Sequence, residues 1–170
     1  MPPRHAPTRR GPVHTVIDAH NLIYADAQLR AYMDEPEAAR AALLALVHGV
    51  PRLRLVCDGG PGGQPSVAVR QGVTVVYSGR RPADDAIVDW LVAHPQLHAV
   101  VVTDDGALAR RARIVGARVL GCVAFLQGLP AALGTEHDAR RAPPSAAEVE
   151  RWLSLFGIVP GADGSESTEP

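Results

Sequence analysis

The feature that most constrains the fold of this chain is a regular alternation of short apolar segments with longer amphipathic ones. Residues 99–103 are β-branched and do not alternate with polar residues, which is typical of a strand covered on both faces. After Pro82, the side chains of Ala83, Ile87 and Leu91 recur at helical spacing. We expect strands at 13–18, 52–58, 73–78, 99–103 and 118–121, and helices at 19–24, 38–47, from 82 onward, at 106–115 and at 145–156.

Strands that alternate with helices predict a parallel sheet with right-handed crossovers and with helices on both faces. The expected fold is therefore α/β, a three-layer α/β/α domain with a central parallel sheet of about five strands. The length of 170 residues is that of one domain, which we place at 13–160. The proline- and arginine-rich residues 1–12 predict a disordered basic arm, and residues 161–170 a disordered acidic tail. Between 122 and 144 the pattern weakens and predicts no element.

Composition restricts the compartment and the chemistry. No apolar run approaches the roughly 20 residues of a membrane span, and no hydrophobic segment follows the N-terminal arginines, so we expect a cytoplasmic protein without membrane contact. Cys57 and Cys122 have no CxxC spacing and are expected to be buried thiols. The net charge of −1 gives no overall attraction to nucleic acid, and the absence of lysine excludes lysine-dependent chemistry.

Aspartates follow several of the expected strands. Asp18 ends the first strand, Asp84 and Asp85 begin the helix after the third, and Asp105 follows the fourth. Ligand crevices in open α/β sheets lie outside the carboxyl ends of the strands, where these side chains should meet. Carboxylates grouped in a cleft raise each other's pKa or require a cation. Ligand sets made only of oxygen select Mg²⁺ or Mn²⁺.

Each acid also has a purely structural interpretation. Asp18 could close a turn and Asn21 could cap the next helix. Asp84 and Asp85 could each gain only about 0.3–1 kcal/mol from the helix dipole. Asp84 borders the apolar face of its helix, so we rank it above Asp85 as a ligand.

The remaining acids have structural interpretations of the same kind. Asp105 could cap the helix that follows it, and Asp104 could point to solvent. Asp89 is expected to be solvated, although it repels Asp85 at i,i+4 unless a positive group is near. The run Asp34-Glu35-Pro36-Glu37 resembles a capping box, so we interpret these acids as helix caps.

Three segments, 16–23, 83–87 and 101–105, together resemble the acidic motifs of the NYN branch of the PIN-like nucleases, and most closely the YacP-type family of small bacterial ribonucleases. The resemblance covers about residues 13–121 and implies a NYN/PIN-like nuclease domain. It assigns Asp18, Asn21, Asp84, Asp85 and Asp105 to the active site. The chain departs from the family pattern at residues 19–20, where Ala-His replaces Gly-Tyr.

The resemblance implies a metal-dependent endoribonuclease that cleaves single-stranded RNA and leaves a 5′-phosphate and a 3′-hydroxyl. One or two Mg²⁺ or Mn²⁺ ions, held by the four aspartates, would activate water, and Asn21 would orient it or a phosphate oxygen. Messenger RNA on or near the ribosome is the implied setting, with no organic cofactor.

Arginines and one histidine complete the expected site. Arg80 and Arg81 are placed to clamp phosphates, with a solvated loop as the alternative, and His20 lines the pocket and could stack on a base. Arg110, Arg111 and Arg113 are expected on a solvent face. The alternative function is a PIN-like module that binds RNA or a protein without cleavage.

Overall fold

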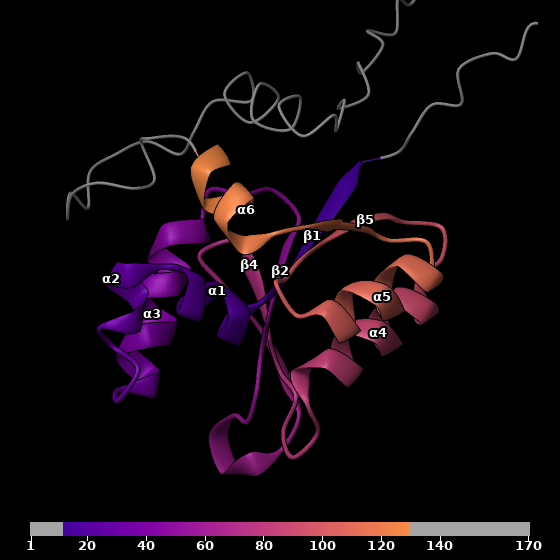
Figure 1. The fold of residues 1–170 in the computed structure, drawn as a ribbon. Helices are drawn as coiled ribbons and strands as arrows, with labels where there is room; N and C mark the ends of the chain where they lie inside the picture. Colours follow the sequence, from indigo (N-terminus) through magenta and orange to yellow (C-terminus); the bar gives the residue numbers. More distant parts are fainter. Residues whose placement is uncertain (1–11, 130–170) are drawn as a thin grey trace, which may run out of the picture.

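A computed structural model describes residues 12–129 of the protein (Figure 1). These residues form one sheet of six strands in the order β3-β4-β2-β1-β5-β6. The strands are β1 (Val13–Asp18), β2 (Leu53–Cys57), β3 (Ser66–Arg70), β4 (Val73–Tyr77), β5 (His98–Val102) and β6 (Arg118–Leu120). All neighbouring pairs are parallel except β3 and β4, which are antiparallel. The expected final helix at 145–156 and the acidic tail lie outside the described residues, as does the basic arm apart from Pro12.

Helices cover both faces of the sheet, which confirms the expected three-layer α/β/α fold (Figure 1). On one face, Leu22, Leu43 and Phe125 are completely buried, and on the other face Ile87 and Leu108 are completely buried. The first layer contains α1 (Ala19–Ala25), α2 (Ala27–Arg30), α3 (Pro36–Val47) and α6 (Cys122–Gly128), and the second contains α4 (Ala83–Ala93) and α5 (Gly106–Ile114).

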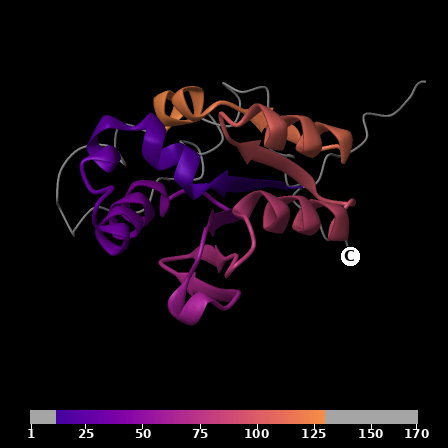
Figure 2. The same cartoon turned by 60° about the horizontal axis from the view of Figure 1, so that its bottom comes forward.

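The sheet has one strand more than the sequence pattern predicted. Strand β3 pairs with β4 through a tight turn in which Gln71 and Gly72 have φ angles of 51° and 78°. The hairpin projects from the body of the domain together with the short 3₁₀ helix η1 (Pro61–Gly63) (Figure 2). Val67 and Val69 remain 64% and 74% exposed, so β3 has little burial to make its pattern recognisable.

Two expectations about helices were wrong. Residues 122–128 form α6, where no element was expected, because Asp104 accepts a hydrogen bond from the amide of Cys122 at 2.9 Å and Phe125 enters the core. The run 34–37 is not a capping box: Glu35 occupies the cap position of α3 without a side-chain hydrogen bond. Glu37 instead pairs with Arg40, one helical turn away, at 2.6 Å.

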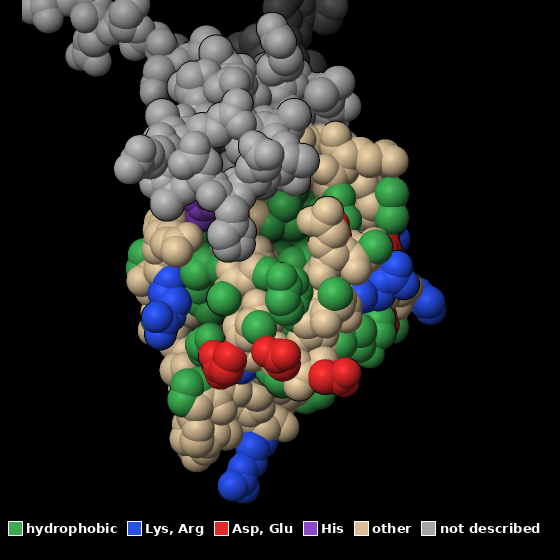
Figure 3. All heavy atoms as spheres, turned by 90° about the vertical axis from the view of Figure 1, so that its left-hand side faces the viewer, with side chains coloured by type: hydrophobic (Ala, Val, Ile, Leu, Met, Phe, Trp, Pro, Cys, Tyr) green, Lys and Arg blue, Asp and Glu red, His purple; other side chains and the backbone are tan. Residues whose placement is uncertain are grey.

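The side formed by α2 and α3 shows apolar side chains in its centre with acidic side chains below them (Figure 3). Tyr32 and Met33, which follow α2, are 44% and 38% exposed. None of the helices within residues 12–129 combines the length and the apolar character that a membrane crossing requires.

Both cysteines are buried free thiols, as expected. Burial raises the pKa of each thiol to about 12, and for Cys122 the neighbouring Asp104 raises it further. Thiolates are the reactive form of cysteine, so Cys57 and Cys122 serve packing.

Replacing Phe125 tests whether α6 belongs to the core. Phe125→Ala should lower the free energy of unfolding by about 3–5 kcal/mol, because a fully buried aromatic side chain leaves a cavity. Val123→Ala, on the exposed side of the same helix, should change it by less than about 0.5 kcal/mol. Urea unfolding followed by circular dichroism measures both. Equal effects of the two substitutions would show that α6 does not pack on the sheet.

Candidate functional site

Asp18 is the most deeply buried carboxylate among the described residues. It ends β1 and caps α1, so that only 2% of its surface is exposed. Asn21 donates to it twice, from the backbone amide to Oδ1 at 3.3 Å and from Nδ2 to Oδ2 at 2.5 Å. The Thr103 hydroxyl lies 3.5 Å from Oδ2. The cap of α1 is therefore Asp18, and Asn21 holds that cap in place.

Burial raises the pKa of Asp18, and the negative charge of Asp58 raises it further, while the hydrogen bonds from Asn21 and the nearby His20 act in the opposite direction. The net shift is upward. The folded protein thus stabilises this carboxylate in its charged form less well than water does.

Asp84 and Asp58 join Asp18 from neighbouring strand ends. Helix α4 begins at Ala83, one residue later than expected, because Pro82 takes the cap position and Asp58 accepts a hydrogen bond from the amide of Ala83 at 2.8 Å. Burial raises the pKa of Asp84, and Asp18, Asp105 and Asp58 raise it further, whereas Arg111 lowers it. Asp58 was not identified as a site residue from the sequence. Its position after β2 was the available signal.

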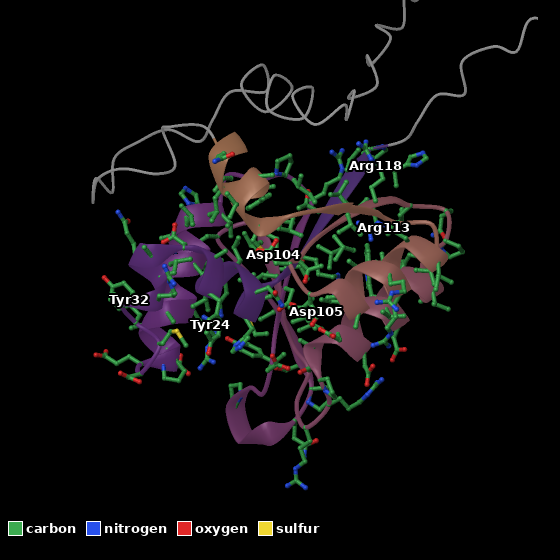
Figure 4. All side chains as sticks on the ribbon, viewed as in Figure 1. Tyr24, Tyr32, Asp104, Asp105, Arg113 and Arg118 are labelled. Carbon is green, nitrogen blue, oxygen red and sulfur yellow. The ribbon has the colours of Figure 1, made fainter. Side chains whose placement is uncertain are left out.

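Asp105 has a structural role as well as a place in the acidic group. Its Oδ1 accepts from the amide of Leu108 at 2.7 Å and caps α5, while its own amide donates to the Thr103 hydroxyl at 3.1 Å. Asp104 is exposed, as expected, and its Oδ1 also accepts a hydrogen bond from the amide of Cys122 at the start of α6. Figure 4 shows both aspartates at the centre of the molecule, where the strands end.

The polar side of α4 carries two ion pairs. Arg111 of α5 contacts Asp85 at 2.8 Å, and Arg81 contacts Asp89 at 2.8 Å. These ion pairs relieve the i,i+4 repulsion between Asp85 and Asp89. Asp89 and Arg111 were expected to be solvated, and each instead takes part in an ion pair. The hydrogen bond from Arg81 to Asp89 raises the pKa of Arg81. Arg80 is exposed beside η1.

An aromatic pair borders the acidic group on the side of α1. The rings of His20 and Tyr24 have centroids 4.5 Å apart and are tilted by 54°. His20 is exposed, and Tyr24 is 47% exposed and points away from the body on the α1 side (Figure 4). Tyr24 was not identified from the sequence, although it lies one helical turn after His20.

The acids are close enough to influence one another but do not form a closed coordination shell. Within residues 12–129, no three His, Cys, Asp or Glu side chains converge to the spacing of a metal site. Asp18, Asp58 and Asp105 accept hydrogen bonds from helix-start amides, and Asp84 makes no hydrogen bond or ion pair with any described residue. An oxygen-only donor set with an unpartnered, repelled carboxylate fits a hard divalent cation, which would relieve the repulsion.

The mostly parallel sheet between two helical layers is the α/β/α architecture expected from the sequence. A search of solved structures finds this fold in a mutant form of Rae1 (YacP) from Bacillus subtilis, with a TM-score of 0.54 and 18% sequence identity over 69% of this chain and 76% of that one. No family model matches the sequence. No curated protein matches it either. The similarity to Rae1 confirms the expected fold.

Replacing Asp84 tests whether the acids repel one another. Because its pKa is raised above the ordinary 3.8, Asp84 contributes stability below pH 3.8 that is lost as the pH rises through the raised value. Asp84→Asn should therefore unfold at a higher temperature than wild type at pH 7, and this advantage should disappear below pH 3.8. Thermal unfolding at both pH values measures it, with the exposed Asp34→Asn as the control. A less stable Asp84→Asn at pH 7 would mean that the attraction of α4's dipole for Asp84 outweighs the repulsion.

Proposed function

We propose that the protein is a metal-dependent endoribonuclease that hydrolyses single-stranded RNA and leaves a 5′-phosphate and a 3′-hydroxyl. The observation that carries this proposal is the gathering of Asp18, Asp58 and Asp105 from three other strand ends around Asp84, whose pKa is raised by burial and by these neighbours. The PIN-like fold and the three acidic motifs support it. The proposed setting is messenger RNA at or near the ribosome in the cytoplasm.

Asp18, Asp84 and Asp105 would hold one or two Mg²⁺ or Mn²⁺ ions, with Asp85 as a further ligand. Such ions supply Lewis acidity toward the phosphodiester and lower the pKa of water. Asn21 keeps both oxygens of Asp18 oriented through its two hydrogen bonds. To bind a metal ion, Asp85 would have to break its ion pair with Arg111. The guanidinium of Arg111 would then be free to contact a phosphate.

The His20–Tyr24 pair and Arg80 would bind the RNA on either side of the scissile bond. Aromatic faces stack on bases of any sequence, so the pair would accept unpaired nucleotides. Arg80 is exposed and, within the described residues, makes no ion pair, which leaves it available to a phosphate. Arg81 is paired with Asp89 and would contribute only after that pair opens.

The decisive test compares cleavage by wild type with that by Asp18→Asn, Asp84→Asn and Asp105→Asn. Each substitution removes a ligand charge and should reduce kcat/KM on single-stranded RNA by more than about 100-fold, and chelator should abolish cleavage. The control is Asp34→Asn, in the turn before α3. Labelled oligonucleotides resolved on gels, with end-group analysis, measure rate and product chemistry. Cleavage that survives in chelator would exclude the mechanism.

A readout that does not depend on activity separates a nuclease from a module that only binds RNA. Mg²⁺ or Mn²⁺ should raise the melting temperature of wild type in proportion to site occupancy and leave that of Asp84→Asn unchanged. If neither ion shifts the wild-type melting temperature and RNA still binds, the non-catalytic module is the correct alternative.

Tyr24 provides a test of the stacking surface. Tyr24→Ala should raise KM for single-stranded RNA by about 5- to 100-fold, since one base–aromatic stack contributes about 1–3 kcal/mol, while kcat changes little. Tyr24→Phe keeps the ring and should behave as wild type. Steady-state kinetics on a short oligonucleotide distinguish the two. A Tyr24→Phe variant as weak as Tyr24→Ala would assign the effect to the hydroxyl and not to stacking.

A further inference from the structure

The edge of the sheet at which the strands begin has a charge opposite to that of the acidic edge. The segments 12–16, 48–54, 70–74, 90–100 and 113–121 lead into or begin the strands and contain no Asp or Glu. Arginine and histidine are thus the only charged or titratable side-chain types of these segments, although the net charge of the whole chain is −1. The cationic and titratable residues of these segments are His14, His48, Arg52, Arg54, Arg70, His94, His98, Arg113 and Arg118.

Some of these side chains pack around Trp90 of α4. The guanidinium carbon of Arg54 lies 4.8 Å from the centroid of the Trp90 ring. The ring of His94 stacks on the Trp90 ring, with the two centroids 4.7 Å apart and the ring planes at 27°. The Nδ1 of His94 lies 2.8 Å from the carbonyl oxygen of Trp90. The ring of His14 is 6.1 Å away. The positive groups are therefore held on an ordered aromatic support.

Arg52 and Arg54 are not neutralised by acids of the described residues. The ion pairs within residues 12–129 involve Arg40, Arg81 and Arg111, and neither Arg52 nor Arg54 takes part in one. Burial lowers the pKa of His14, and Arg52, His94 and Arg54 lower it further. The group thus repels additional positive charge, and an anion would relieve that repulsion.

The edge at which the strands begin, called the basic edge from here on, extends across several strands. Arg52 precedes β2, whose Leu53 pairs with Thr15 of β1, and Arg118 begins β6 opposite Val100 of β5. Four adjacent strands spaced about 4.8 Å apart span about 14 Å. Figure 4 shows Arg118 near the start of β1 and Arg113 at the outer end of α5, away from Asp104 and Asp105.

We propose that this basic edge binds the phosphodiester backbone of a second segment of RNA, separate from the segment cleaved at the acidic edge. That the polyanion is RNA rests on the proposed function. The six residues of β1 separate the two edges by about 20 Å, so a short oligonucleotide at the acids does not reach the basic edge. Arginine contacts with phosphates position a nucleic acid without reading its sequence. The edge would therefore increase affinity for long or structured RNA without altering the cleavage chemistry.

Salt-dependent binding of a labelled RNA of about 30 nucleotides, measured by fluorescence anisotropy in chelator, tests the proposal without any cleavage. Arg52→Asn with Arg113→Gln removes two exposed charges from the basic edge. Asparagine suits the φ of 50° at position 52. The matched control, Arg30→Gln with Arg110→Gln, removes two exposed charges elsewhere. The slope of log K against log salt should fall in magnitude by about 1.4 for the first pair only, because each lost contact with single-stranded RNA removes about 0.7.

Equal slopes for the two double variants, with both folded by circular dichroism, would overturn the proposal. Unchanged cleavage of a short oligonucleotide by the Arg52/Arg113 variant is also expected, and a parallel loss of that cleavage would place these arginines at the acidic site instead. Failure of the nuclease proposal is recognised separately, since it would appear as cleavage that is independent of Asp18 and Asp84, whatever the slopes.

Fluorescence of Trp90 locates the bound RNA. The chain has two tryptophans, so Trp152→Phe leaves Trp90 as the sole emitter. RNA should change its emission in a way that salt reverses, whereas polyglutamate at equal charge concentration should not. An equal response to polyglutamate would assign the edge to acidic proteins and overturn the RNA assignment, as would RNA binding that leaves Trp90 emission unchanged.

Discussion

The placement of one carboxylate in the interior determines how the rest of the acidic edge is built. Asp18 is 2% exposed at the end of a central strand, where burial raises its pKa. A buried carboxylate without partners would be strongly unfavourable, and Asp18 accepts two hydrogen bonds from Asn21 and a longer one from the Thr103 hydroxyl. Because Asn21 occupies both oxygens from the side of α1, the remaining open directions face the other strand ends. The central position of β1 thus directs Asp18 toward Asp58 and Asp84.

The acids of this edge are stabilised in two different ways. Asp58 and Asp105 each accept a hydrogen bond from an amide at a helix start, which secures the helix and orients the carboxylate. Asp85 is instead neutralised by Arg111 from the neighbouring helix. Asp84 has neither kind of partner among the described residues, and its pKa is raised first by burial and then by Asp18, Asp105 and Asp58. A cation would therefore gain most at Asp84, although folding alone accounts for the position of every other acid.

Sequence patterns predicted the elements whose burial is periodic and missed those fixed by single contacts. Strand β1 and the helix that begins after Pro82 follow from their apolar spacing. Strand β3 is exposed on an edge, and α6 begins with a hydrogen bond that the Cys122 amide donates to Asp104, so neither has a periodic signature. Motif order predicted Asp18, Asp84 and Asp105 together. The roles of Asp58 and Arg111 depend on contacts 25 and 26 residues away in sequence, with Ala83 and Asp85, and only tertiary structure reveals those contacts.

The two charged edges follow from one property of parallel sheets. All strand ends of one kind lie on the same side, so residues in connecting segments add their charges instead of alternating them. Aspartates suit the segments that leave strands because they cap the helices beginning there, while arginine and histidine occupy the segments that enter strands. A net charge near zero then conceals two strong local potentials of opposite sign. A phosphate chain attracted to the basic edge would be repelled at the acidic edge until cations bind there, so the order of binding would be set by the metal.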